Sequence, residues 1–349
     1  MEPSKQMLLQ FHVTAKCDQS CKHCYMHECS TYKSELENEL SFSDCKKVID
    51  EFANMTKAWG VSGRINFSGG NPLLRKDFLN IIKYANEKNL SIGILGNPYH
   101  LTVNLAKKLK DMGVIKYQLS IDGLEKTHDM FRKNGSFKDT IKAIRVLNKV
   151  GITSVVMFTL SRINANELLD VIELVSKENV SIFDFSRLVP LGSGEYLEND
   201  TLTPSEFRGV LFNVLEKYRQ LTERGTKTYF GRKDPLWSLL YEEIGLNKPL
   251  QKTNVIHDGC SIGMRLLSIL ADGTVYACRR LPIKIGKVPE ENLRDIFIKS
   301  KELNCMRDIS KIKGCNNCEL VNYCRGCRAV AYAQNKMHAD KDPQCWKIN

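Results

Sequence analysis

Short apolar segments alternate with helical patterns along the first half of the chain, which restricts the fold to one built around a parallel sheet. The expected strands are rich in valine, isoleucine, leucine and phenylalanine, and they span Leu8–Thr14, Arg64–Ser68, Ser91–Leu95, Tyr117–Ile121, Thr153–Leu160 and Ile182–Arg187. The expected helices span Ser43–Ala58, Lys76–Glu87, Val103–Met112, Phe137–Val150 and Glu167–Lys177. An open doubly wound sheet and a partial barrel both fit this pattern. In either fold the loops after the strands meet at one face, where binding sites are built.

The second half of the chain is less regular and predicts a further domain, as a length of 349 residues also does. A capping box at Thr203-Pro204-Ser205-Glu206 predicts the start of another helix. The segment 226–258 is expected to be a linker or bridging region. Asp272-Gly273, between two short apolar runs, predicts a hairpin. We therefore expect one domain over residues 1–225 and another over residues 259–349.

Thirteen cysteines are the unusual number in the composition. The chain shows no secretory signal and no apolar run long enough to cross a membrane, so we expect a cytoplasmic protein with reduced thiols. In a reducing compartment, cysteines this dense and regularly spaced point to metal binding. The formal net charge of +11 fits either a solvated basic surface or an acidic partner.

The first cysteine group directly follows the first expected strand. Cys17, Cys21 and Cys24 have the spacing C-x3-C-x2-C on one loop. Three such thiolates can hold three irons of a four-iron cluster and leave the fourth iron open for chemistry. A structural zinc site is the alternative, and it needs a fourth ligand such as His12, His23, His27 or Cys29.

This loop resembles that of the radical S-adenosylmethionine (SAM) superfamily, whose C-x3-C-x2-C motif follows the first strand of a partial (β/α)6 barrel. The resemblance implies a [4Fe–4S] cluster on Cys17, Cys21 and Cys24, with SAM at its open iron. Residues near the ends of the expected strands match family segments that bind SAM. The resemblance therefore implies SAM contacts at Tyr25, Ser68, Gly69, Gly70, Asn71, Asn97, Ser120, Asp122, Arg132, Arg187 and Val189.

Asn71 departs from the family pattern, which has Gly-Gly-Glu-Pro where this chain has Gly69-Gly70-Asn71-Pro72. An amide oxygen can accept a hydrogen bond from the ammonium group of SAM, but without the strength of a charge-assisted bond. From the sequence alone, we expect Asn71→Glu to strengthen SAM binding.

The C-terminal cysteines form a second group, with the spacing Cys260-x12-Gly273-x4-Cys278, Cys315-x2-Cys318-x5-Cys324-x2-Cys327 and Cys345. Paired zinc knuckles are the alternative, but zinc ribbons separate their cysteine pairs by more residues. The pattern resembles the SPASM extension of radical SAM enzymes, which carries two auxiliary iron–sulfur clusters.

The resemblance to SPASM domains implies one set of ligands for each auxiliary cluster. The outer cluster takes Cys315, Cys318, Cys324 and Cys345. The inner cluster takes Cys260, Cys278 and Cys327, and its fourth iron is either open or held by His257 or Asp258. With the first loop, this makes three [4Fe–4S] clusters. The expected fold is thus an α/β chain, a partial (β/α)6 TIM-like barrel followed by a small Cys-rich iron–sulfur domain.

The resemblance also implies the activity, which is reductive cleavage of SAM and removal of hydrogen from a peptide or protein side chain. The expected partners are a peptide with an acidic leader, a reductant such as flavodoxin or ferredoxin, and a separate leader-binding protein. One alternative is an enzyme of the haem pathway acting on a tetrapyrrole carboxylate, which also suits a basic cleft. Another is a non-catalytic metal protein that binds nucleic acid, but the aromatic and basic interleaving of single-strand binders is missing.

Overall fold

The computed structural model describes residues 6–27, 29–246 and 255–347, and its strands form one ten-stranded sheet. The strands are β1 (Gln6–Thr14), β2 (Ser62–Gly69), β3 (Ser91–Leu95), β4 (Val114–Ser120), β5 (Thr153–Leu160), β6 (Ile182–Arg187), β7 (Tyr229–Phe230), β8 (Leu266–Ile269), β9 (Thr274–Cys278) and β10 (Leu281–Lys287). Most helices lie between successive strands. They are α1 (Tyr32–Glu37), α2 (Phe42–Ala58), α3 (Phe78–Glu87), α4 (Val103–Asp111), α5 (Glu125–Phe131), α6 (Ser136–Val150), α7 (Leu168–Lys177), α8 (Pro204–Glu223), α9 (Trp237–Glu243), α10 (Leu293–Lys299), α11 (Lys301–Arg307) and α12 (Arg328–Asn335), with short 3-10 helices that include η1 (Pro72–Leu74) and η3 (Gly192–Asp200).

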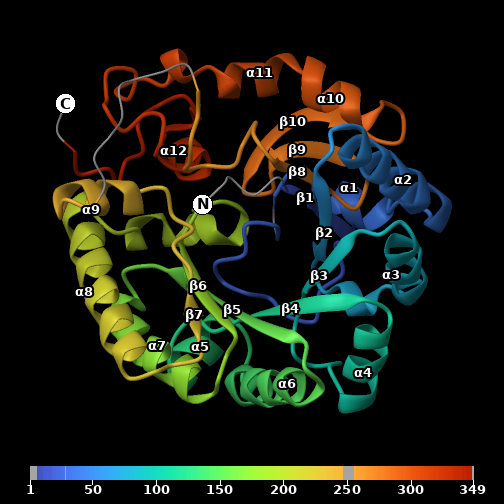
Figure 1. Ribbon diagram of the computed structural model, residues 1–349, viewed down its shortest axis with the longest axis horizontal. Coiled ribbons are helices and arrows are strands. Elements are labelled where there is room, and N and C mark those ends of the chain that lie inside the picture. The colour runs from blue at the N-terminus through green and yellow to red at the C-terminus, as the bar shows by residue number, and fades with distance from the viewer. Residues whose placement is uncertain (1–5, 28, 247–254, 348–349) are drawn as a thin grey trace.

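The order of the strands decides between the two folds that the sequence left open. β1 to β6 are parallel and lie side by side in chain order, with no reversal of direction along the sheet. A doubly wound sheet would reverse its order at the middle, whereas a barrel keeps it. Figure 1 shows the sheet curving, with α2, α3, α4, α6, α7 and α8 around its outside. The fold is a partial barrel, as the resemblance implied.

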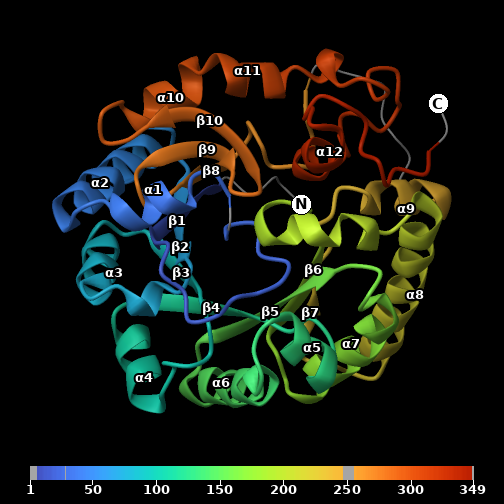
Figure 2. The same cartoon turned by 180° about the vertical axis from the view of Figure 1, so that it is seen from behind.

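The C-terminal part of the chain continues this sheet. β8 pairs in parallel with β1, through Leu8 with Leu266 to Phe11 with Ile269, and β9 and β10 follow as antiparallel strands. The reversal around Asp272 is the hairpin that the sequence predicts. Figure 2 shows the C-terminal segment spanning from these strands across to α9.

The segment expected to be a linker also takes part in the barrel. Its residues Tyr229–Phe230 form β7, which pairs with β6, and Trp237–Glu243 form α9. Residues 247–254 of that segment lie outside the described part of the chain. Among the described residues, no helix is both long and apolar enough to cross a bilayer.

The two faces of the sheet differ in chemistry. Along β2, Ile65 and Phe67 are fully buried, and the ring of Phe67 packs edge-on against Phe78 of α3. Arg64 and Asn66 alternate with them and therefore point to the inner face of the barrel. The helices thus cover an apolar outer face, and a polar inner face is left around the barrel axis.

Several expected elements agree with the structure to the residue, and others differ for identifiable reasons. β3, β5 and β6 have the predicted bounds, and the capping box of α8 is formed by Thr203 and Glu206. β4 begins earlier than expected, at Val114, because its first residues include the exposed Ile115 and give no alternating pattern. Helix α5, Glu125–Phe131, has too few turns to show a helical period and was missed.

Candidate functional site

Two glycines hold the cysteine loop against the end of β2. The backbone N–H of Gly70 donates to the carbonyl of Thr14 at 3.0 Å, and that of Asn71 donates to the carbonyl of Lys16 at 2.8 Å. A Cβ on Gly70 would lie 2.1 Å from the Lys16 oxygen, and one on Gly69 would lie 1.9 Å from the Thr14 oxygen. Only glycine permits this approach, so the two residues fix the start of the loop that carries Cys17.

The three thiols of that loop lie within electrostatic range of one another and are surrounded by donors. Asn97 donates from Nδ2 to Cys17 Sγ at 3.4 Å, and the Nη1 group of Arg132 lies 3.7 Å from Cys21 Sγ. Backbone N–H groups donate to the sulfur of Cys24. Burial raises the pKa of Cys21 to about 12, and the charge of Arg132 opposes that rise. Thiolates that accept hydrogen bonds beside a cation fit an iron–sulfur cluster.

Among the described residues, no three His, Cys, Asp or Glu side chains are grouped to hold a single metal ion, as the zinc alternative requires.

Asp122 positions the charge beside this loop. Its carboxylate accepts hydrogen bonds from Nε of Arg132 and from the backbone N–H of Thr159, and it lies 2.8 Å from Nε2 of His23. Burial alone would raise the pKa of Asp122, but Arg132 and His23 hold it far below its usual range. Since Asp122 is fully buried with these partners, its role in this geometry is to orient Arg132 over Cys21.

A carboxylate that the sequence reasoning missed lies beside Asn71. Asp18 accepts hydrogen bonds from Nδ2 of Asn71, at 2.9 Å, and from Nδ2 of Asn97, and it lies 3.1 Å from Nε2 of His100. The Oδ1 atom of Asn71 caps η1 by accepting from the backbone of Leu73 at 3.3 Å. The negative charge at this end of β2 therefore belongs to Asp18, although the family pattern places it on the residue that is Asn71 here.

This contact changes the expected result of Asn71→Glu. A glutamate there would face Asp18 as a like charge, so we expect SAM affinity to fall about tenfold. The double variant Asn71→Glu with Asp18→Asn exchanges the charged and neutral positions, and we expect it to restore most of the affinity. Equilibrium dialysis of SAM against the reconstituted protein measures both. Tighter binding by the single variant would show that Asp18 does not determine the charge at this site.

The remaining residues expected at SAM have different surroundings. Ser68 accepts a hydrogen bond from Gln10 at 3.2 Å, and Ser120 ends β4 on the inner face. The carbonyl of Val189 accepts from the backbone of Leu191 at 2.8 Å. Tyr25 is half-buried near both Cys24 and Cys278, and desolvation raises its pKa. Tyr25 thus lies between the first cysteine loop and the C-terminal cysteines.

Arg187 is engaged entirely by protein groups. Its guanidinium pairs with Asp234 through Nε and Nη2, at 2.7 and 3.2 Å. It also pairs with both oxygens of Asp342 at 2.8 Å and donates to Gln344 at 2.7 Å. These bonds use all its N–H groups, so none is left to donate to SAM. In this geometry Arg187 joins β6 to the segment before Cys345 and has no free donor for a cofactor.

The C-terminal thiols fall into two neighbourhoods. Burial raises the pKa of Cys324, and the nearby Cys345 and Cys315 raise it further. Burial raises the pKa of Cys315 to about 11, with Cys345 and Cys318 adding to the rise. These four thiols are the ones expected to hold the outer cluster.

Cys327 belongs to the second neighbourhood. Burial raises its pKa, Arg280 opposes the rise, and Cys260 adds to it. Arg280 also lies near Cys278, so it connects the three thiols expected at the inner cluster. His257, one candidate for the fourth ligand, is exposed and stacks on Tyr323 with ring centroids 5.1 Å apart.

The arginine next to Cys278 reaches into the barrel domain. Arg279 donates from Nη2 to the buried Glu35 at 2.8 Å and from Nε to Nδ1 of His12 at 3.3 Å. Its guanidinium also lies 5.8 Å from the ring centroid of Tyr25. This network could not be predicted from the sequence, because its members come from β1, α1 and the residue after β9.

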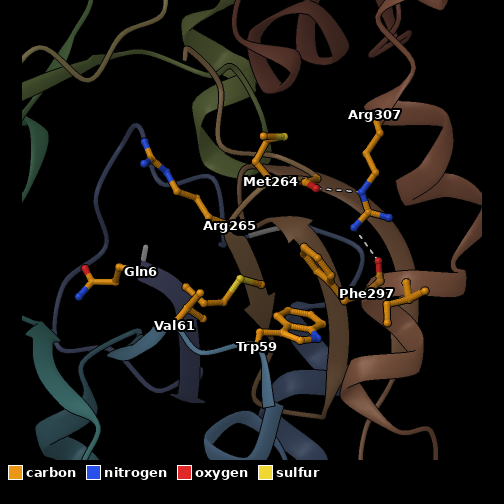
Figure 3. A pocket seen from close by; sticks show the side chains of 10 residues that line it. Gln6, Trp59, Val61, Met264, Arg265, Phe297 and Arg307 are labelled. Atoms are coloured by element: carbon orange, nitrogen blue, oxygen red, sulfur yellow. Dashed lines mark hydrogen bonds between the residues drawn. The ribbon is translucent and has the colours of Figure 1, made fainter. Parts of the chain in front are cut away.

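A cavity of about 580 Å³ lies at the opposite end of the strands. Figure 3 shows its lining, with Gln6 at the start of β1, Val61 just before β2 and Arg265 just before β8. On its C-terminal side, Arg307 donates to the carbonyls of Gly263 and Phe297 at 2.8 and 2.6 Å. Because these are the amino ends of the strands, this cavity is separate from the site at the carboxyl ends.

Two family models match the chain. Residues 11–175 match the radical SAM superfamily, and residues 260–328 match SPASM, an iron–sulfur cluster-binding domain. The first match contains the loop with Cys17, Cys21 and Cys24, and the second begins at Cys260 and ends one residue after Cys327.

Similar curated proteins span nearly the whole chain. An AdoMet-dependent heme synthase of Methanosarcina barkeri is 29% identical over 97% of this chain and 95% of its own length. An Fe-coproporphyrin III synthase of the same organism is 28% identical, covering 98% and 88%. The mycofactocin maturase MftC of Mycolicibacterium smegmatis is 25% identical, covering 97% and 82%. Among solved structures, native anSMEcpe with bound AdoMet superposes with a TM-score of 0.72 at 19% identity, covering 97% of this chain and 94% of that one.

Proposed function

The chain is a radical SAM enzyme with a C-terminal SPASM domain, and we propose that it acts on a carboxylate-bearing side chain of a tetrapyrrole. The relatives named as heme and Fe-coproporphyrin III synthases support this substrate, because they align along nearly their whole length. The expectation of a peptide substrate becomes the second candidate.

The observation that carries the proposal is a pair of cations beside the thiols of the inner auxiliary site. Arg280 and Lys233 lie close to each other, and both lie close to Cys278 and Cys327. Burial lowers the pKa of Lys233, and the charge of Arg280 lowers it further. Two like charges held together in this way favour an anionic group between or beside them.

When bound, SAM and a reduced [4Fe–4S] cluster supply a 5′-deoxyadenosyl radical, which removes a hydrogen atom from an unactivated carbon. The chain contributes the positions of the groups. Gly69 and Gly70 hold the cysteine loop, and Asp18 offers a carboxylate to the ammonium group of SAM. Arg280 and Lys233 would hold a substrate carboxylate, so that the ring-attached carbon of the same side chain faces the first cysteine loop.

For a propionate side chain, the proposed reaction removes one hydrogen atom from the carbon attached to the ring. The bond to the carboxyl carbon then breaks, CO₂ leaves, and one electron passes to an external one-electron acceptor. A vinyl group remains on the tetrapyrrole.

We also propose three [4Fe–4S] clusters, one on the first cysteine loop and two on the C-terminal ligands named above. The inner site offers only three cysteines, so its fourth iron is open or takes His257 or Asp258. A reductant such as flavodoxin or ferredoxin supplies electrons. Because thiolate ligands must stay reduced, we place the enzyme in the cytoplasm.

The second candidate is maturation of a peptide, and the match to MftC favours it. In that case the basic inner groups would meet acidic residues of a peptide or its leader. A separate leader-binding protein would then be a further partner.

The assay that tests the proposal uses the anaerobically reconstituted enzyme with SAM, a reductant and iron coproporphyrin III. We expect the porphyrin to stimulate 5′-deoxyadenosine formation and to become lighter by one CO₂ and two hydrogen atoms for each propionate converted. A parallel reaction uses the product of a short peptide gene next to this one. An unchanged porphyrin mass together with a modified peptide would transfer the assignment to the second candidate.

A further inference from the structure

Four basic side chains line the inner face of the barrel without partners. Across residues 6–27, 29–246 and 255–347, the side chains of Arg64, Lys116, Lys233 and Arg280 form no ion pair and donate no hydrogen bond to another group. The other interior arginines differ, since Arg187 and Arg279 are paired with buried carboxylates.

The strand register places the first two of these cations together. In the sheet, Gly93 of β3 is opposite Asn66 of β2 on one side and Lys116 of β4 on the other. A Cβ on Gly93 would lie 2.7 Å from Cε of Lys116 and 2.5 Å from Oδ1 of Asn66. The stem of Lys116 therefore extends across β3 toward β2, where Arg64 precedes Asn66 on the same face.

Each of the four cations lies close enough to the next for their charges to interact, so they form one continuous group. Burial, together with the nearby charges of Arg64 and Lys233, lowers the pKa of Lys116 to about 8. Lys233 in turn neighbours Arg280. Two carboxylates lie near this group: Asp184 of β6 near Lys233, and Asp234, which is paired with Arg187, near Arg280. Asp184 accepts hydrogen bonds from the backbone N–H groups of Phe185 and Lys233 at 2.8 and 3.4 Å. We call Arg64, Lys116, Lys233 and Arg280 the basic lining.

Unpaired charges in a partly buried position cost stability, so a fold that keeps Arg64, Lys116 and Arg280 half-buried beside the exposed Lys233 gains nothing from them without a ligand. The Nε group of Arg64 is fully buried with no acceptor, as is Oδ1 of Asn66 with no donor. We propose that the basic lining is a binding site for a polycarboxylate whose acid groups are spread around a flat molecule. The choice of a tetrapyrrole as that molecule rests on the proposed function; the anion site itself does not.

The basic lining extends from the inner auxiliary site to the amino-terminal half of β2 and β4. Binding of a single reacting carboxylate would need only part of this length. Arg280 and Lys233 lie beside the thiols of that site, whereas Lys116 and Arg64 lie deeper in the barrel. We infer that the deeper pair holds carboxylates that do not react, and that it thereby sets which side chain faces the cysteine loop.

The test measures binding in the absence of reductant and SAM, so turnover does not enter. Absorption titration of the reconstituted enzyme with iron coproporphyrin III is compared with titration with its methyl ester, which has the same iron-containing ring without the carboxylate charges. We expect Lys116→Gln and Arg280→Gln each to weaken binding of the acid about tenfold, because each removes a charge-assisted contact. Neither variant should affect the ester.

Two further variants separate charge from folding. Gly93→Ala changes no charge but displaces the stem of Lys116, so it should also weaken binding of the acid. Lys107→Gln removes an exposed lysine on α4 and should leave the affinity unchanged. Lys116→Gln should not lower the midpoint of thermal unfolding, because the charge it removes is unpaired.

The outcomes separate the proposal of an anion site at the basic lining from the proposal that the substrate is a tetrapyrrole. If the acid binds tightly and the lining variants bind it as well as the parent, the basic lining is wrong and the proposed function stands. If an oligoglutamate peptide binds instead of the porphyrin, with loss in Lys116→Gln, the lining stands and the tetrapyrrole assignment is wrong. If neither the porphyrin nor the peptide binds, both proposals are wrong.

Discussion

Replacing Cys17, Cys21 and Cys24 together by alanine is expected to remove about one third of the iron and all cleavage of SAM. Three four-iron clusters amount to about twelve irons per chain, and the triple variant removes the ligands of one. The groups around these thiols, Asn97 and Arg132, are hydrogen-bond donors and cannot replace the thiolates as iron ligands. Iron analysis and chromatography of 5′-deoxyadenosine measure the two losses.

The matched control for this variant is Cys45→Ala. Cys45 is fully buried in α2, and no other cysteine is among its electrostatic neighbours, so its removal should change neither iron content nor cleavage. If the triple variant keeps as much iron as the parent enzyme, this loop does not bind a cluster. If it still cleaves SAM, the active site is not at this loop.

Arg187→Met is expected to destabilise the enzyme by about 3–5 kcal/mol, the usual cost of leaving a buried ion pair without one partner. The side chains of Arg187 and Asp342 are each 1% exposed, so the carboxylates of Asp234 and Asp342 would stay buried without their cation. Thermal unfolding of the reconstituted protein should show a midpoint lower by several degrees. Because Asp342 also accepts from the backbone N–H of Cys327 at 2.7 Å, we expect iron to be lost from the inner auxiliary site as well.

Arg208→Met provides the control for that change, since Arg208 forms a comparable pair with Glu243 on the surface. Exposed pairs contribute at most about 1 kcal/mol. Combining Arg187→Met with Asp234→Asn and Asp342→Asn should recover part of the stability, because the uncompensated charges are then gone. A loss for Arg187→Met no larger than that for Arg208→Met would show that the buried network does not stabilise the join between the domains.

The sequence was sufficient for the features that repeat locally. Apolar runs at the spacing of strands predicted β3, β5 and β6 to the residue, and the capping box predicted the start of α8. Cysteine spacing identified the family because a short loop fixes which thiols come together. These signals lie within a few residues of one another in the chain, so no tertiary structure is needed to interpret them.

Contacts between residues far apart in the chain could not be predicted from the sequence. The resemblance implied a SAM contact at Arg187, and nothing near Arg187 in the sequence points to Asp342, its partner 155 residues away. Asp18 is adjacent to Cys17, yet its contact with Asn71 depends on how the two glycines bring the loops together. Arg64 and Lys116 show only as polar positions in alternating strands until the sheet curves and places them on one face.

The pairing of β8 with β1 has a consequence for how the chain is made. Leu8 emerges from the ribosome before the rest of the barrel domain, but its partner Leu266 emerges only after that domain has been synthesised. Until then, the strand that leads into the cysteine loop has a free edge that can pair with another copy. The nascent enzyme is therefore most prone to aggregate just before its C-terminal strands arrive. Slower translation would prolong that interval, and folding helpers that cover exposed strands would act on it.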